Sequence, residues 1–174
     1  MQMKPVRALT LSGILAALSF LLLFIGSLLD VTDLAAVMVA SFFVTLLVVE
    51  CRGAWPWLLY VTVSVLSFLL LPGRFVTLEY VFFGGIWPIL KYWLERLPRL
   101  PSFLLKLLVG NALAFAAAWL GLRFFGLEIP SALWLRILAV VMWEAVLLIY
   151  DLLLTRLIVL WCVKYRARFR RLFR

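Results

Sequence analysis

The sequence contains no histidine and only two cysteines, Cys51 and Cys162. Without histidine the chain can form no imidazole proton relay, no histidine metal site and no Ser–His–Asp triad. The two cysteines are isolated and form no Cys-x-x-Cys motif. A Walker loop, an aspartate-rich metal motif and a nucleophile elbow are missing as well. We therefore expect a protein that is not an enzyme and that uses no metal and no cofactor.

Charged residues are also scarce. They make up 14% of the 174 residues, whereas 67% are hydrophobic and the mean hydropathy is +1.17. So little polar material cannot cover the surface of a soluble globule. A membrane helix needs about 20 apolar residues, so the chain has room for about six. No linker, low-complexity segment or clear internal repeat divides it, which predicts a single domain.

Six apolar segments are separated by charged residues, prolines and glycines. They cover approximately residues 6–29, 34–50, 55–71, 75–94, 102–122 and from 131 onwards. The first run, from Val6 to Leu29, is longer than the apolar part of a signal peptide, so we expect it to be a membrane helix. The sequence predicts an all-α, polytopic membrane protein. Its bundle of six transmembrane helices would cover residues 1–163, followed by a basic tail over residues 164–174.

The basic residues predict the orientation of this bundle. Thirteen of the 17 Lys and Arg residues fall in the tail and in one set of alternating connections, a set that includes Lys91 and Lys106. The opposite set holds only Arg74, Arg123 and Arg136. Because basic residues stay on the cytoplasmic side, both termini are predicted to be cytoplasmic in a bacterial cell membrane. The net charge of +9 then serves contact with anionic lipid rather than with nucleic acid.

Two carboxylates, Glu144 and Asp151, lie in the apolar stretch WEAVLLIYDLLLTR. Their spacing of seven residues places them on one helix face, about 10 Å apart. An ionised carboxylate in lipid costs about 2.5–3.5 kcal/mol, so this face must look into the bundle or a wet cavity. Such acids form either a substrate or ion site, or hydrogen bonds that hold helices together. Arg156 points to a different side, so we expect partners on other helices. The candidates are Lys106, Asn111 and Tyr60.

A third acid, Glu79, lies near the outer end of the fourth segment, beside Tyr80. One interpretation is that both residues line the mouth of an outward-facing pocket. The other is that Glu79 lies at the membrane interface and pairs with Arg74.

The same segment is predicted to kink in the stretch FFGGIWPILK. Pro88 has no amide hydrogen for the carbonyl of Gly84, and a second glycine follows. A kink would widen a cavity with Trp87 as a wall. Alternatively, the glycines serve only the close packing of helices.

Small residues recur every four positions in the first segment, at Ala8, Ser12 and Ala16. This spacing makes a flat face on which another helix can lie closely. The partner would be either a helix of the same bundle or a separate membrane subunit.

A basic six-helix protein of this size, with such a face on its first helix, resembles the substrate-binding S components of energy-coupling-factor transporters. The segments GGIWPILK and LIYDLLLTRL also resemble small Firmicutes membrane proteins related to that group. The resemblance implies that a vitamin-like molecule binds from outside. The implied substrate-binding residues are Glu79, Tyr80, Trp87, Asn111 and Glu144. It further implies a membrane coupling subunit and a pair of ATPases as partners. The implied contacts with the coupling subunit are Ala8, Ser12 and Ala16.

Two other classes of function fit the same composition. The chain resembles, in size and helix count, the rod-shape-determining membrane proteins, which act as non-catalytic scaffolds in cell-wall elongation. A small proton-coupled carrier using Glu144 and Asp151 is the third alternative. Such carriers are often built from an inverted repeat, which the sequence does not show.

Overall fold

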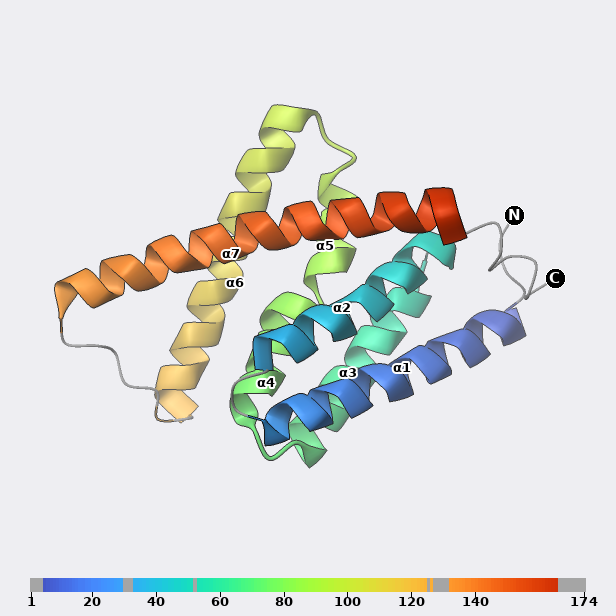
Figure 1. Cartoon of the computed structure of the whole chain (residues 1–174), viewed down its shortest axis with the longest axis horizontal. Coiled ribbons are helices and arrows are strands. Elements are labelled where there is room, and N and C mark those ends of the chain that lie inside the picture. The colour runs from blue at the N-terminus through green and yellow to red at the C-terminus, as the bar shows by residue number, and fades with distance from the viewer. Residues whose placement is uncertain (1–4, 30–32, 52, 125, 127–131, 166–174) are drawn as a thin grey trace.

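The computed structural model describes residues 5–29, 33–51, 53–124, 126 and 132–165, and Figure 1 shows their arrangement. Within these residues the chain is helical and contains no strand. The helices are α1 (Pro5–Leu28), α2 (Asp33–Glu50), α3 (Trp55–Leu70), α4 (Arg74–Glu79), η1 (Tyr80–Gly84), α5 (Trp87–Leu94), α6 (Arg99–Phe124), α7 (Leu133–Leu160) and η2 (Trp161–Tyr165). All six predicted segments are therefore helical. The fourth is divided into α4, the π-helical turn η1 and α5.

Four helices are long and apolar enough to cross a membrane: α1, α2, α6 and the continuous helix formed by α7 and η2. At 1.5 Å per residue, even the 18 residues of α2 approach the thickness of a hydrocarbon layer. Helix α3 has 16 residues and is shorter. The all-helical fold is thus confirmed, whereas a count of six crossings stays a prediction. Of the predicted tail, Lys164 and Tyr165 continue the last helix, and residues 166–174 lie outside the described residues.

The core lies where α1 packs against α2 and α3. Leu23, Val37, Val44 and Leu59 are fully buried there. The hydroxyl of Ser19, also fully buried, donates to the carbonyl of Leu15 one turn earlier. This bond removes the cost of placing a hydroxyl among apolar side chains.

The small residues of α1 belong to this core. Ala8, Ser12 and Ala16 are 1%, 1% and 8% exposed, because the face that carries them is the face of α1 that packs on α2 and α3. They therefore serve contact within the chain. The expectation that they meet a separate coupling subunit is corrected, since no free surface is left on these residues for another protein.

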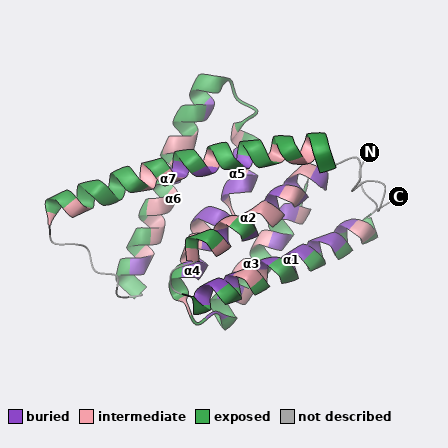
Figure 2. Ribbon diagram, viewed as in Figure 1, coloured by how far each residue is buried: buried purple, intermediate pink, exposed green. Residues whose placement is uncertain are grey.

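Helices α6 and α7 pack much more loosely. Figure 1 shows α7 running along the length of the molecule while α6 crosses it steeply. Most of their surface is exposed, as Figure 2 shows. In α7 only Leu147, Tyr150 and Leu154, near the middle of the helix, are buried. The exposed side chains are mainly large and apolar, including Phe115 on α6 and Ile137 on α7. Water disfavours such a surface, and hydrocarbon favours it.

The break in the fourth segment confirms the predicted kink. The amide of Gly85 donates to the carbonyl of Tyr80, five residues back, at 2.6 Å. This pattern leaves the carbonyl of Val81 without its usual partner, and the hydroxyl of Tyr60 on α3 donates to it instead, at 3.0 Å. Pro88 follows in the first turn of α5, where a missing amide hydrogen costs nothing.

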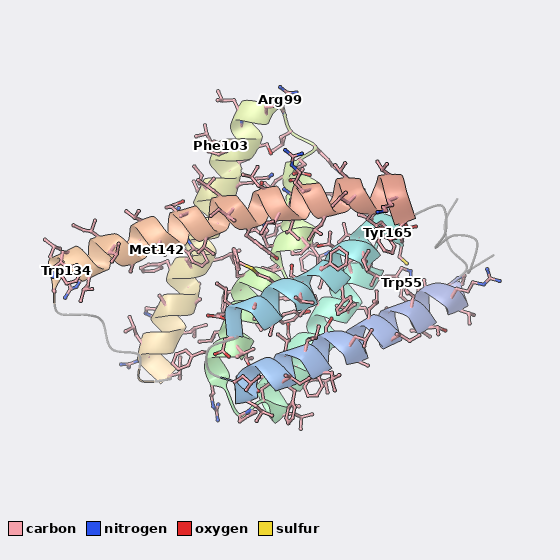
Figure 3. All side chains as sticks on the ribbon, viewed as in Figure 1. Trp55, Arg99, Phe103, Trp134, Met142 and Tyr165 are labelled. Carbon is pink, nitrogen blue, oxygen red and sulfur yellow. The ribbon has the colours of Figure 1, made fainter. Side chains whose placement is uncertain are left out.

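The two ends of the molecule carry aromatic side chains. Figure 3 shows Trp55 and Tyr165 at one end, and Trp134 at the opposite end of the long axis. The described ends of the chain, at α1 and η2, lie at the same end as Trp55.

Candidate functional site

A cavity of about 670 Å³ lies between α4, η1, α6 and α7, with the start of α2 at its edge. We call it the main cavity. Its walls are almost entirely apolar. Aromatic side chains come from several elements, and alanines 114, 117 and 118 of α6 keep the space open because their side chains are short. The loose packing of α6 and α7 is the structural cause of the cavity.

Two of the predicted substrate-binding residues line the main cavity, Glu79 from α4 and Asn111 from α6. The Nδ2 atom of Asn111 donates to the carbonyl of Leu107 at 3.0 Å and to Oε1 of Glu144 at 2.6 Å. Glu144 therefore contacts the cavity wall through its hydrogen bond with Asn111, which was one of its predicted partners. The Oε2 atom of Glu79 is buried without a hydrogen-bond partner.

Two other predicted residues, Tyr80 and Trp87, do not line the main cavity, and this expectation is corrected. Both side chains are fully buried. Successive helical residues point about 100° apart, so a turn that presents Glu79 to the cavity directs Tyr80 into the core, beside Tyr60. Trp87 lies beyond the break and packs against Phe83 in a second apolar cluster.

That second cluster is a layer of aromatic rings. Phe83 lies 4.5 Å from Tyr150, 5.1 Å from Trp143 and 6.0 Å from Trp87, measured between ring centroids. The Tyr150 hydroxyl shares a hydrogen bond with Ser41 of α2. Along the fourth segment, Phe83 and Trp87 come between Glu79 and Lys91, and along α7, Tyr150 comes between Glu144 and Asp151. Sequence reasoning missed this layer because its rings come from separate segments.

A group of charged residues joins α5, α6 and α7, and we call it the ion cluster. Nζ of Lys91 lies 2.6 Å from Oδ1 of Asp151 and 2.7 Å from Oε1 of Glu95. Nζ of Lys106 lies 2.9 Å from Oδ2 of Asp151 and 3.0 Å from the same Glu95 oxygen. Two bases thus balance two acids. Lys106 is confirmed as a partner of Asp151, whereas Tyr60 binds the Val81 carbonyl instead.

The position of Lys91 differs most from the position predicted from the sequence. It was expected in a cytoplasmic connection, but its side chain is 1% exposed and also donates to the Asp151 carbonyl at 3.1 Å. One sequence signal could have revealed this role. Lys91 is flanked by apolar residues in IWPILKYWL and lies four residues before Glu95, on the same helix face.

The remaining polar chemistry is limited. No group of three or more metal-ligating side chains occurs among the residues that the structure describes. Cys51 follows α2, and burial, with a smaller contribution from Glu50, raises the pKa of its thiol to about 11. It stays protonated at neutral pH and is a poor nucleophile. The chain matches no protein-family model, no curated protein and no solved structure. Its function is therefore inferred from the main cavity.

Proposed function

We propose that this chain is a non-enzymatic, multi-pass protein of the bacterial cell membrane that binds a small molecule in the main cavity. The cavity carries this proposal. Its volume of about 670 Å³ falls within the range of small-molecule sites, about 300–1,000 Å³. Apolar walls with a few polar groups are typical of such sites. Glu79 and Asn111 are the polar groups here, with Glu144 supporting Asn111.

The membrane setting is supported by the distribution of apolar surface. Four helices are long and apolar enough to cross a bilayer. The exposed faces of α6 and α7 would be unfavourable in water and favourable in lipid. In the ion cluster, Lys91, Lys106 and Asp151 are paired and largely shielded between helices, as expected for charged groups at membrane depth. We propose that all six helical segments are embedded, with both termini in the cytoplasm.

The proposed role is that of the substrate-binding subunit of an uptake transporter of the energy-coupling-factor type. Such a subunit would leave ATP hydrolysis to an ATPase pair and would join it through a membrane coupling subunit. The small-residue face of α1 is occupied by α2 and α3, so this contact would have to use another surface.

Native mass spectrometry of the full chain, purified in mild detergent, tests small-molecule binding. We expect a retained molecule that is lost in Ala114→Trp, which fills the main cavity. The matched control is Ala17→Trp, which places the same ring on the exposed face of α1. Its bound molecule should be unchanged.

The alternatives give different results. If the chain is a membrane scaffold of the rod-shape-determining kind, neither the unaltered chain nor either variant would retain a small molecule. This outcome would overturn the proposal. A proton-coupled carrier would accumulate substrate in liposomes from a pH gradient alone. The proposed subunit would do so only with its ATPase partners.

A further inference from the structure

Aromatic rings surround the main cavity on several sides. They are Phe75 from α4, Phe82 and Phe83 from η1, Phe115 from α6 and Trp143 from α7. The face of an aromatic ring is electron-rich and attracts organic cations, most strongly when water is excluded. A wall built only to hold a neutral apolar molecule could use aliphatic side chains instead.

The polar groups of the wall also favour a positively charged ligand. Among the described residues that line the cavity, Glu79 is the one carboxylate, and none is Lys or Arg. Both amide hydrogens of Asn111 are committed, to Leu107 and Glu144. The indole N–H of Trp143 is buried without a partner. This single neutral donor could not balance the charge of an anion.

A second acid, Asp33, begins α2 and immediately precedes Leu34, which lines the cavity. A buried carboxylate oxygen without a hydrogen bond is costly, and a positively charged ligand would offset that cost.

We infer that the main cavity binds a lipophilic organic cation, an apolar molecule with one positively charged group held between Glu79 and the aromatic wall. This inference rests on the proposed function, because it specifies the class of ligand for the same site. The preference runs against the net charge of the chain, +9. Non-specific attraction would therefore favour anions.

The test compares two ions of nearly the same size and shape but opposite charge, tetraphenylphosphonium and tetraphenylborate. Equilibrium dialysis of the full chain in a neutral detergent, corrected with protein-free micelles, measures both affinities. We expect tetraphenylphosphonium to bind at least about tenfold more tightly, a difference of about 1.4 kcal/mol. Equal affinities, or tighter binding of the anion, would overturn the inference.

A matched pair of variants locates the cation. Glu79→Gln removes the charge and keeps the shape, and we expect it to weaken tetraphenylphosphonium binding about tenfold. Glu95→Gln makes the same change in the ion cluster, outside the main cavity, and its binding should equal that of the unaltered chain. Equal binding by all three proteins would contradict the assignment to Glu79. If either variant fails to stay monodisperse, the comparison of the two ions with the unaltered chain still decides.

The inference and the proposed function can fail separately. A natural molecule that is retained by the chain, lost in Ala114→Trp and found to be neutral or anionic would sustain the binding function and overturn the cation inference. Loss of tetraphenylphosphonium binding in Ala114→Trp, with the predicted charge preference, would support both.

Discussion

Lys91 is buried, although lysine side chains usually lie at the protein surface. Its ammonium group is almost completely buried and contacts two carboxylates and one carbonyl. Removing a charge from water is costly, so a buried ion pair adds little net stability. Removing one partner is strongly destabilising, because the other charge stays buried without compensation. Lys106, on the opposite side of Asp151, can compensate only in part because it already serves both acids.

Replacing Lys91 by Met should therefore destabilise the chain. We expect Lys91→Met to lower the free energy of unfolding by about 3 kcal/mol, because Asp151 and Glu95 then share one base. Thermal unfolding in detergent, followed by circular dichroism, measures the change. The double variant Lys91→Met, Glu95→Gln restores charge balance and should recover part of the loss.

The control for this change is Lys164→Met, which alters an exposed lysine in η2. Its stability should stay within about 0.5 kcal/mol of the unaltered chain. If Lys91→Met were equally harmless, the ion cluster would contribute nothing to the packing of α5, α6 and α7.

At the level of elements, the broken fourth segment positions the site. The π-helical turn places Phe82 and Phe83 in the wall of the main cavity while Tyr80 points into the core. Close packing against α2 holds the turn in place. A side chain added at Gly84 would clash with Cγ1 of Val37 and come within 3.1 Å of the Val37 carbonyl oxygen. The backbone there cannot move without disturbing α2.

Gly84→Ala should therefore cost about 1–3 kcal/mol, the usual penalty for overpacking a filled interior. Thermal unfolding in detergent measures this cost. The matched control is Gly13→Ala on α1, where an added methyl group meets nothing within 4 Å. We expect no loss there, since alanine favours a helix over glycine by up to about 1 kcal/mol. Equal stability of the two variants would show that the turn does not depend on contact with α2.

The whole molecule combines a well-packed part with a loosely packed part. Helices α1, α2 and α3 share one core, whereas α6 and α7 touch the rest along short stretches and expose apolar surface. The described ends of the chain lie at the same end of the long axis. We propose that the last described residue also lies on the same side of the membrane as the first.

Reporter fusions can test that arrangement. We expect a fluorescent protein fused after Tyr165 to fluoresce, because it remains in the cytoplasm. Alkaline phosphatase fused after Gly126, between α6 and α7, should be active, because it is exported. Phosphatase activity from a fusion after Tyr165 would contradict an even number of membrane crossings.

Local composition was enough to predict much of this protein. Each run of apolar residues is helical, with ends close to the predicted ones, because the runs are separated by local clusters of charged residues, prolines and glycines. The kink before Pro88 was predictable for the same reason. Partners of Asp151 and Glu144 were partly predictable, since a buried acid needs a base or an amide and few were available.

The tertiary structure alone decided which side of each helix faces the cavity. Glu79 and Asn111 line it while Tyr80 and Trp87 do not, and Lys91 lies inside the protein rather than in a connection. The rotation of a helix depends on contacts with segments far away in the chain, here between α2, α5 and α7. Hydropathy along the chain carries little information about that rotation, because apolar side chains occupy both the lipid-facing and the core-facing sides of these helices.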